Sequence, residues 1–225
     1  MAEAALKHGY TNATATEGRS VVKRYRGPGG DVRQHNEVAA LSGLAGQIPV
    51  PPLLAVGDGE VTLGLVPGRP GQELLEDQPE PVLYATGRLA RRLAAVDVSL
   101  ASGLDTAPGG TVPVHGDFGP QNLLLDEDTA EPTALLDWEF AHVGDPVEDI
   151  AWAEWIVRTH HAHLVSALPA LFAGYGAEPP WPVRHRSMLA KCEWLLGFTR
   201  RWPDPTQAGV ELWQRRLAAT AAFAP

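Results

Sequence analysis

The chain has 225 residues, of which 44% are hydrophobic and 20% are charged, as in a globular protein rather than a disordered or fibrous one. Its formal net charge of −9 argues against nucleic acid as a main partner, because a phosphate backbone requires a basic surface. The single Cys192 excludes an intrachain disulfide and a cysteine-based zinc site. An unpaired thiol, no secretory signal pattern and no apolar run of about 20 residues predict a cytoplasmic protein without a membrane segment.

The first third of the chain is predicted to be a small sheet with one helix. Runs of small and β-branched residues indicate the strands, and apolar residues at helical spacing indicate the helix. In chain order these elements are strands at 9–16 and 19–25, a helix at 32–45, and strands at 53–56 and 61–66. Asp31 followed by Gln34 is typical of a capping box, so we expect these two side chains to close the start of the helix.

A proline- and glycine-rich segment at 67–71 separates this part from a mainly helical remainder. The remainder is predicted to hold helices at 81–98, 148–163, 182–202 and 209–222, and two short apolar runs at 112–114 and 134–136. We therefore expect two domains, residues 1–66 and 67–225. The first carries six acidic and six basic side chains, so the whole net charge of −9 lies in the second. That charge either keeps the protein soluble or attracts a cationic ligand.

The strongest chemical signal follows the first of these apolar runs. His115-Gly116-Asp117 is followed by Asn122, and Asp137 comes directly after the second apolar run. This spacing resembles the catalytic loop of kinase-like phosphotransferases. In such a loop Asp117 would orient an incoming hydroxyl and accept its proton, while Asn122 and Asp137 would supply the oxygen ligands that Mg²⁺ prefers. A turn whose aspartate caps the backbone is the alternative interpretation of the triplet alone.

Three motifs in this order resemble the aminoglycoside phosphotransferase and choline kinase superfamily, also called the phosphotransferase enzyme family. They are the loop from His115 to Asn122, the segment Leu136-Asp137-Trp138-Glu139, and the run at 144–151 that reads GDPVEDIA. The resemblance is clear over about residues 9–155 and loose beyond them. It implies an α+β, bilobal protein-kinase-like fold, with a small β-rich N-lobe that binds nucleotide and a larger, mainly helical C-lobe that holds the catalytic loop and the acceptor.

The resemblance also implies a nucleotide site in the first lobe. The candidate nucleotide-binding residues are Tyr10, Thr11, Asn12, Lys23, Glu37, Leu63 and Leu65. Backbone and hydroxyl groups of the loop at 9–14 would contact phosphates. Lys23 would pair with the phosphates, and Glu37 would hold Lys23 in place, although two solvated charges are the alternative. The hinge around 63–66 would contact the adenine.

Other residues near the motifs are expected to support the site. By resemblance His115 would hold the catalytic loop through hydrogen bonds, and Asp145 and Asp149 would brace it from the start of a helix. Glu139 would support the metal, approach a cationic substrate or lie on the surface. The tryptophans of the second lobe are expected mostly in its core. The part after residue 151 is short for this family, so we expect an acceptor pocket that is open, small or completed by a second chain, in a monomer or a homodimer.

The function that the resemblance implies is ATP- or GTP-dependent, magnesium-dependent transfer of a phosphoryl group to a hydroxyl of a small molecule. An aminoglycoside or another cationic antibiotic is the first candidate acceptor, with weak support from the acidic second lobe. Choline, an amino alcohol or a sugar is the alternative acceptor. Two alternatives concern the chemistry itself: a catalytically silent nucleotide-binding pseudokinase, and an enzyme that transfers a nucleotidyl group instead.

Overall fold

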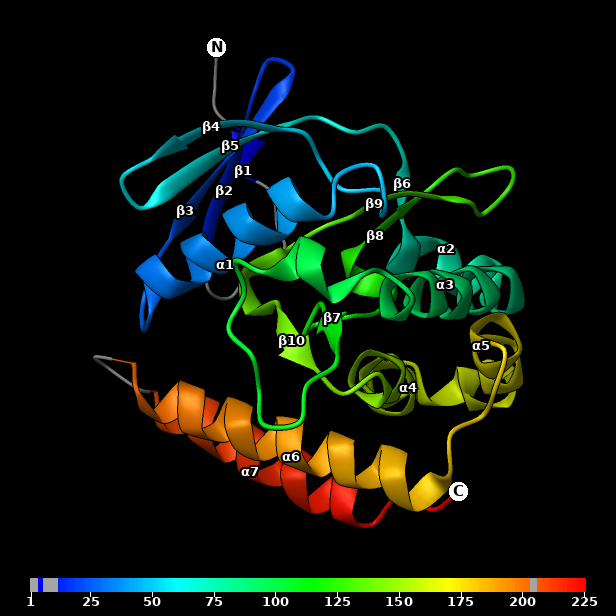
Figure 1. Cartoon of the computed structure of the whole chain (residues 1–225). Helices are drawn as coiled ribbons and strands as arrows, with labels where there is room; N and C mark the ends of the chain where they lie inside the picture. Colours follow the sequence, from blue (N-terminus) through cyan, green and yellow to red (C-terminus); the bar gives the residue numbers. More distant parts are fainter. Residues whose placement is uncertain (1–3, 6–11, 203–205) are drawn as a thin grey trace.

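The computed structural model describes residues 4–5, 12–202 and 206–225. Its small lobe is a five-stranded antiparallel sheet with one helix packed on it (Figure 1). The strands are β1 (Ala4–Ala5), β2 (Asn12–Glu17), β3 (Ser20–Tyr25), β4 (Leu53–Gly57) and β5 (Glu60–Gly64), in the order β1-β2-β3-β5-β4 across the sheet. The central strand β3 carries Lys23, which contacts Glu37 of α1 (Gly30–Gly43).

The predicted capping box at the start of α1 is not formed. The helix begins at Gly30, after Gly29 in the left-handed conformation, and no side chain caps it. Gln34 instead donates hydrogen bonds to the carbonyl oxygens of Gly57, at 2.6 Å, and Glu60, at 3.0 Å. The side chain that resembled a cap therefore fastens α1 to the hairpin of β4 and β5.

The larger lobe is mainly helical and contains two small sheets. Its helices are α2 (Gly71–Asp77), α3 (Pro79–Ala94), α4 (Val147–His160), α5 (Leu168–Tyr175), α6 (Trp181–Arg200) and α7 (Gln207–Ala221). Its strands are β6 (Arg69–Pro70), β7 (Val112–Val114), β8 (Leu123–Leu125), β9 (Pro132–Leu135) and β10 (His142–Gly144). β6, β8 and β9 form one sheet, and β7 pairs with β10. Figure 1 shows α6 and α7 side by side on the side of the molecule away from the small lobe's sheet.

Helices α3 and α5 pack closely because a glycine lies at each contact point. A Cβ atom on Gly87 would lie 1.9 Å from the carbonyl oxygen of Leu171, and one on Gly174 would lie 2.1 Å from that of Tyr84. Any side chain at either position would push the two helices apart. This tight pair forms one flank of the core around α4, whose Trp155 is almost completely buried.

The helices predicted for this lobe differ from the observed ones at several points. The helix predicted at 81–98 ends at Ala94, and the one predicted at 148–163 ends at His160 and is followed by a 3₁₀ helix, Ala162–Ala167. Helices α2 and α5 were not predicted, the second because Pro169 interrupts the uncharged run at 164–177 in which it lies. In the structure Pro169 lies in the first turn of α5, where its missing N–H costs no hydrogen bond.

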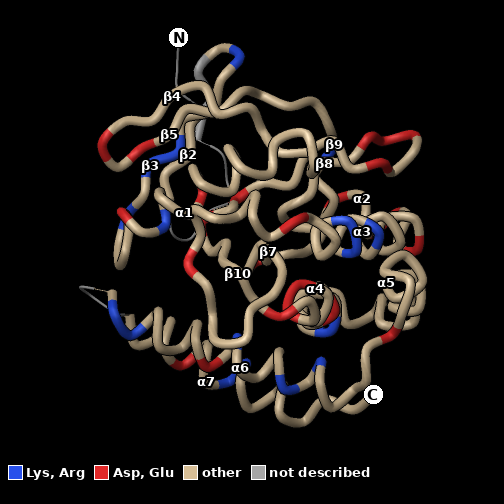
Figure 2. The backbone as a smooth tube through the Cα atoms, in the orientation of Figure 1, with Lys and Arg blue, Asp and Glu red and all other residues tan. Residues whose placement is uncertain are grey.

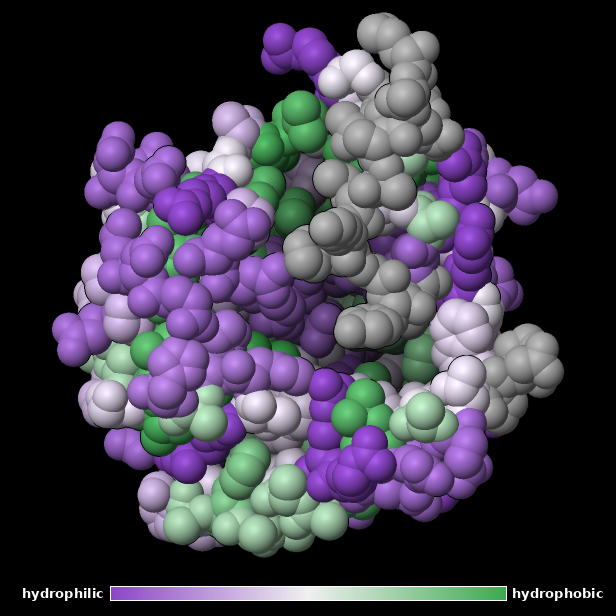
Figure 3. Space-filling view, turned by 180° about the vertical axis from the view of Figure 1, so that it is seen from behind, coloured by the Kyte–Doolittle hydropathy of each residue, from purple (hydrophilic) through white to green (hydrophobic). Residues whose placement is uncertain are grey.

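The predicted α+β, bilobal architecture is confirmed, while the domain boundary at residue 66 stays a prediction. Within the described ranges, none of the helices is both long and apolar enough to cross a lipid bilayer. Seen from behind, the surface is hydrophilic over much of its area, and apolar residues form separate smaller areas (Figure 3).

Candidate active site

The predicted catalytic loop connects two strands that belong to different small sheets. It follows β7, includes the 3₁₀ turn Pro120–Asn122 and leads directly into β8. Gly116 has a φ of 81°, and a Cβ atom there would lie 2.3 Å from the carbonyl oxygen of Phe140. Only glycine fits both this conformation and this close approach, which explains the residue between His115 and Asp117.

His115 joins the catalytic loop to the segment that carries Asp137. Its Nε2 lies 2.8 Å from the carbonyl oxygen of Leu136, and its Nδ1 accepts a 3.2 Å hydrogen bond from the backbone N–H of Asp117. These contacts require a proton on Nε2 and none on Nδ1. Burial lowers the pKa of His115 to about 4, so the ring is neutral. The geometry gives His115 the holding contacts expected from the sequence.

Asp149 braces the same loop from the first turn of α4. Its carboxylate accepts hydrogen bonds from the backbone N–H groups of His115, at 2.9 Å, and Gly116, at 3.1 Å. Burial raises the pKa of Asp149 to about 6, while the two donated hydrogen bonds oppose this shift. Asp145 accepts a 2.9 Å hydrogen bond from the N–H of Val147, so it supports the start of α4 rather than the loop.

The carboxylate of Asp117 is held from two sides. Its Oδ2 accepts a 3.0 Å hydrogen bond from Nδ2 of Asn122, and its Oδ1 accepts a 2.8 Å hydrogen bond from Nε1 of Trp152. Burial raises the pKa of Asp117 to about 6, and the carboxylate of Asp137 adds to this effect, whereas Lys191 opposes it. A fixed carboxylate with a pKa near neutrality is suited to accept a proton. No local pattern in the sequence indicated the contact of Trp152 with Asp117, and Trp152 was expected in the core.

Trp152→Phe should lower kcat about tenfold and leave the affinity for nucleotide unchanged, because Asp117 loses one hydrogen bond that orients it. The protein should stay folded, since phenylalanine can still stack on Trp155, whose ring centroid lies 4.2 Å from that of Trp152. Steady-state kinetics would measure the effect. Trp213→Phe is the matched control, because Trp213 also stacks on Trp155 and does not hydrogen-bond to Asp117. Equal kcat values for the two variants would contradict the positioning role.

Lys23 links the small lobe to the segment after β9. Its ammonium group hydrogen-bonds to Glu37 and to Oδ1 of Asp137, at 2.5 Å, and lies 3.8 Å from Oε2 of Glu139. Burial alone would lower the pKa of Lys23, but the carboxylates of Asp137, Glu37 and Glu139 raise it above its ordinary value. Lys23 is therefore charged, and the structure brings together the predicted Lys23–Glu37 pair and the predicted metal ligand Asp137.

Glu139 is buried in a second ion pair at the same junction. Its Oε2 accepts hydrogen bonds from Nη1 of Arg33, at 2.8 Å, and from Nδ2 of Asn12, at 2.6 Å. Arg33 Nη1 also donates to Oδ1 of Asn12 at 3.0 Å. Of the three roles considered for Glu139, a surface position is excluded. The sequence contained no signal that Arg33 of α1 would pair with it.

The remaining candidate nucleotide-binding residues are Tyr10, Thr11, Leu63 and Leu65. Tyr10 and Thr11 lie outside the described residues. Leu63 is buried in the hydrophobic core, whereas Leu65 is 54% exposed and follows the end of β5. The backbone N–H of Leu65 donates to the carbonyl oxygen of Arg19 at 3.0 Å, so this connection between the lobes is joined to the turn that precedes β3, the strand that carries Lys23.

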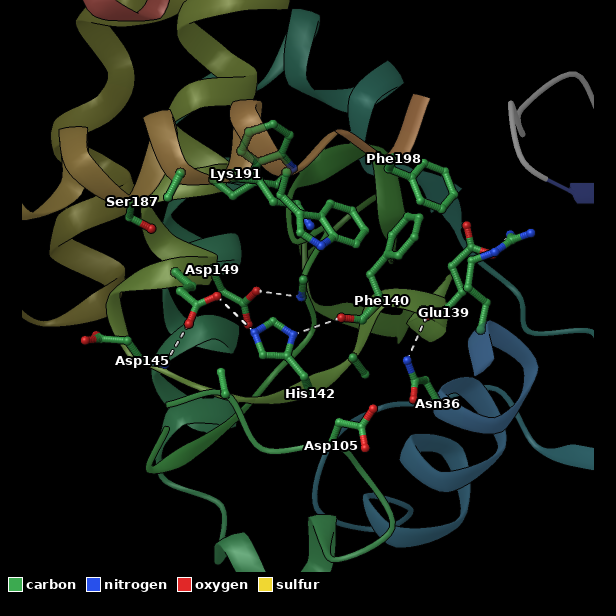
Figure 4. A pocket seen from close by; sticks show the side chains of 18 of the residues that line it. Asn36, Asp105, Glu139, Phe140, His142, Asp145, Asp149, Ser187, Lys191 and Phe198 are labelled. Carbon is green, nitrogen blue, oxygen red and sulfur yellow. Dashed lines mark hydrogen bonds and ion pairs between the residues drawn. The ribbon is translucent and has the colours of Figure 1, made fainter. Parts of the chain in front are cut away.

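A cavity of about 810 Å³ opens beside the catalytic loop (Figure 4). It lies between α1 of the small lobe, the segment from Glu139 to Asp149, and one face of α6. Its wall includes Gly116 of the catalytic loop, and Asp149 and Trp152, which hydrogen-bond to that loop. Neither Asp117 nor Lys23 is part of the wall, but the cavity lies next to Asp117, because Gly116 precedes Asp117 and Trp152 hydrogen-bonds to it.

Comparisons with known proteins agree with the motifs. Residues 99–186 match the model of the phosphotransferase enzyme family. A stretch of 43 residues is 46% identical to acyl-CoA dehydrogenase family member 10 of Mus musculus, but it covers 19% of this chain and only 4% of the mouse protein.

Solved structures resemble nearly the whole chain. Aminoglycoside phosphotransferase APH(4)-Ia, in a ternary complex with AMP-PNP and hygromycin B, superposes with a TM-score of 0.72 at 17% identity, over 99% of this chain and 94% of that one. Macrolide 2'-phosphotransferase MphH from Brachybacterium faecium gives a TM-score of 0.65 at 20% identity, over 99% and 93%. The streptomycin–ATP complex of APH(2")-IIa gives 0.63 at 14% identity, over 97% and 91%.

At these identities the structures establish the fold, and the family match covers the segment that carries the catalytic motifs. The resemblance inferred from the three motifs is therefore confirmed: residues 99–186 match the phosphotransferase enzyme family, and the chain has the protein-kinase-like fold of the aminoglycoside and macrolide phosphotransferase structures.

Proposed function

We propose that this protein is an ATP- or GTP-dependent, magnesium-dependent phosphotransferase that acts on a hydroxyl group of a small molecule. The observation that supports this most is the convergence of three segments at one place. Lys23 from the small lobe contacts Asp137, and Asn122 contacts Asp117 in the adjoining loop. Together these residues would supply a cation for phosphates, two oxygen ligands for a metal and a carboxylate for an acceptor hydroxyl, which are the groups that phosphoryl transfer uses.

The residues on the nucleotide side fit magnesium. Nδ2 of Asn122 makes both of its hydrogen bonds to Asp117, which leaves the amide oxygen for a metal, and Asp137 supplies a carboxylate. The described residues hold no cluster of three or more histidine, cysteine, aspartate or glutamate side chains that could bind a metal by themselves. Magnesium suits such a sparse set, since it binds one or two carboxylates together with phosphate oxygens. When bound, it would offset the negative charge that develops on the phosphates.

The side chains of the protein would contribute to the reaction by positioning the reactants and by balancing their charge. Lys23, held by Glu37, would bind the phosphates through its ammonium group. Asp117, fixed by Asn122 and Trp152, would orient the acceptor hydroxyl in line with the transferred phosphoryl group and accept its proton. His115 would keep the loop in register and transfer no proton, because its ring is neutral and both nitrogens are occupied.

The acceptor would occupy the cavity beside Asp117. The similar structures are named for antibiotics, namely hygromycin B, streptomycin and macrolides. An aminoglycoside or another antibiotic is accordingly one candidate, and choline, an amino alcohol or a sugar is another.

The proposal predicts that Asp137→Asn weakens MgATP binding roughly tenfold, the effect expected from losing one charge-assisted contact, and lowers turnover with it. Isothermal titration calorimetry with and without magnesium, together with ATP and GTP turnover, would measure both effects. Asp128→Asn is the control, because Asp128 is an exposed residue between β8 and β9. Unchanged affinity and unchanged turnover in Asp137→Asn would remove this residue from the metal site, and turnover that persists in a chelator would refute magnesium dependence.

A further inference from the structure

One wall of the cavity beside Asp117 is a single face of α6 that combines aromatic and cationic side chains. Lys191, Trp194 and Phe198 recur at helical spacing and all line the cavity. The ammonium group of Lys191 lies 4.3 Å from the ring centroid of Trp194 and 5.2 Å from that of Phe140. Figure 4 shows Lys191 and Phe198 on one side of the cavity, and Asn36 and Asp105 on the other. An aromatic wall of this kind suits an apolar ligand body.

Among the residues that the structure describes, the cations on this wall form no close ion pair. In this described part of the chain, Lys191 and Arg186 make no hydrogen bond or ion pair, and the guanidinium group of Arg201 lies 5.8 Å from the ring centroid of Phe198. Lys191 is partly withdrawn from water, and this burial lowers its pKa, while the nearby carboxylates of Asp117, Asp149 and Glu148 act in the opposite direction. A cation in such surroundings is stabilised by an anion that enters the cavity.

The carboxylates of the cavity, in contrast, are mostly satisfied by the protein itself. Glu139 is paired with Arg33, Glu148 lies 3.0 Å from Nε2 of His142, and Asp149 accepts the two N–H groups of the catalytic loop. The other two, Asp105 and Asp145, are exposed. The acidic side chains that give the larger lobe its negative charge lie largely elsewhere, for example between β8 and β9 (Figure 2). The excess charge of the lobe is therefore not the charge of the α6 wall.

We propose that the acceptor carries an anionic group, a carboxylate or a phosphate, on an apolar body, and that Lys191 binds this group beside the reacting hydroxyl. The identification of the ligand as an acceptor rests on the proposed function. A polycationic acceptor would place like charges against Lys191 and Arg186 and leave both without a partner. An anionic acceptor would satisfy Lys191 and place its apolar part on Trp194, Phe140 and Phe198.

Three compounds of nearly the same shape and different charge test this inference. Para-hydroxymethyl benzoate is an anion, para-hydroxymethyl benzamide is neutral, and para-hydroxymethyl benzylamine is a cation. Their affinities for the full chain would be measured by calorimetry with magnesium and a non-hydrolysable ATP analogue present, so that the anion does not bind beside Lys23. We expect the benzoate to bind most tightly and the benzylamine least tightly.

The role of Lys191 is tested in the same assay. Lys191→Met should weaken binding of the benzoate roughly 10- to 100-fold, as expected for a lost charge-assisted hydrogen bond, and should change binding of the benzamide little. Lys191→Arg should keep most of the preference for the anion. Arg186→Met, an exposed substitution that leaves the core intact, should reduce the preference less. Arg200→Met is the control, since Arg200 lies at the end of α6 outside the cavity wall.

Equal or tighter binding of the benzylamine, or an anion preference that Lys191→Met and Arg186→Met leave unchanged, would overturn the inference. Binding needs no phosphoryl transfer, so this test is separate from that of the proposed function. A Lys191-dependent preference for the anion in a protein that turns over neither ATP nor GTP would refute the function and retain the anion site. Turnover together with a preference for the cation would support the proposed function and overturn the anion site.

Discussion

Asp117→Asn is expected to lower turnover roughly 10²- to 10⁴-fold while the affinity for MgATP stays within a few-fold, because the variant loses the group that accepts the acceptor's proton. Asparagine has the shape of aspartate, but its single side-chain oxygen can accept only one of the two hydrogen bonds that Trp152 and Asn122 donate to Asp117. Asn122 also donates to the backbone carbonyl oxygen of residue 117, a contact that the substitution leaves in place, so most of the loss should come from the missing proton acceptor. Turnover and calorimetric MgATP affinity are measured on the same preparation.

The control for this variant is Asp126→Asn. Asp126 lies on the surface beyond β8, where its carboxylate accepts hydrogen bonds from the backbone and side chain of its own turn. It should behave as wild type. Turnover of Asp117→Asn within a few-fold of wild type would show that Asp117 is not the base, whatever its place in the loop.

Lys23→Met is expected to destabilise the protein by about 3–5 kcal/mol, the cost of leaving buried charge without its partner. Glu37 and Asp137 both hydrogen-bond to Lys23 and would lose this cation, while Glu139, which lies 3.8 Å from Lys23, would keep its ion pair with Arg33. Chemical unfolding monitored by circular dichroism gives the free energy of unfolding. The affinity of this variant for nucleotide should fall as well as its free energy of unfolding.

Arg24→Met is the matched control, because Arg24 is the next residue on β3 and points to the other face of the sheet. Its ion pair with Glu60 joins side chains that are 43% and 39% exposed, and such pairs contribute about 0–1 kcal/mol. Similar losses for the two variants would contradict the view that Lys23 holds the junction between the lobes.

The sequence was sufficient for the part of the site whose residues are close together in the chain. Asp117 and Asn122 are five residues apart in one loop, and the loop's spacing fixes their contact. Lys23 and Glu37 lie on a strand and the next helix, a pairing that the resemblance to kinases implied and that the small lobe forms. Asp137 was predicted as a metal ligand because it comes directly after an apolar run, which indicated the end of a buried strand.

The sequence was not sufficient where a side chain reaches the site from a distant helix. Trp152 is 35 residues from Asp117 and looks like an ordinary core residue of α4, and only the packing of α4 beneath the loop directs its N–H at the carboxylate. Lys191 likewise looks like a surface lysine until α6 is placed against the catalytic segment. Arg33 and Glu139 are 106 residues apart and belong to different lobes. Such contacts depend on tertiary packing, which a single sequence does not encode in any local pattern.

The failures in secondary structure have a similar origin. Gln34 has the spacing of a capping-box residue, but its side chain donates hydrogen bonds to carbonyl oxygens of the hairpin of β4 and β5. Pro169 looked like an interruption of an apolar run, but it begins α5, a helix whose position depends on glycine contacts with α3. In both cases a residue with two allowed local roles took the one that packing favoured.

Mass spectrometry of the acceptor product would show whether the chain transfers a phosphoryl group to a hydroxyl. A panel of hydroxylated acceptors, anionic, neutral and cationic, is incubated with ATP or GTP and magnesium, and the mass of each acceptor is compared before and after. We expect that one acceptor gains a single phosphoryl group, that the nucleotide leaves as a diphosphate, and that Asp117→Asn forms almost none of this product. An acceptor that gains a nucleotidyl group with release of pyrophosphate, or a phosphorylated product that Asp117→Asn forms at the wild-type rate, would contradict this expectation.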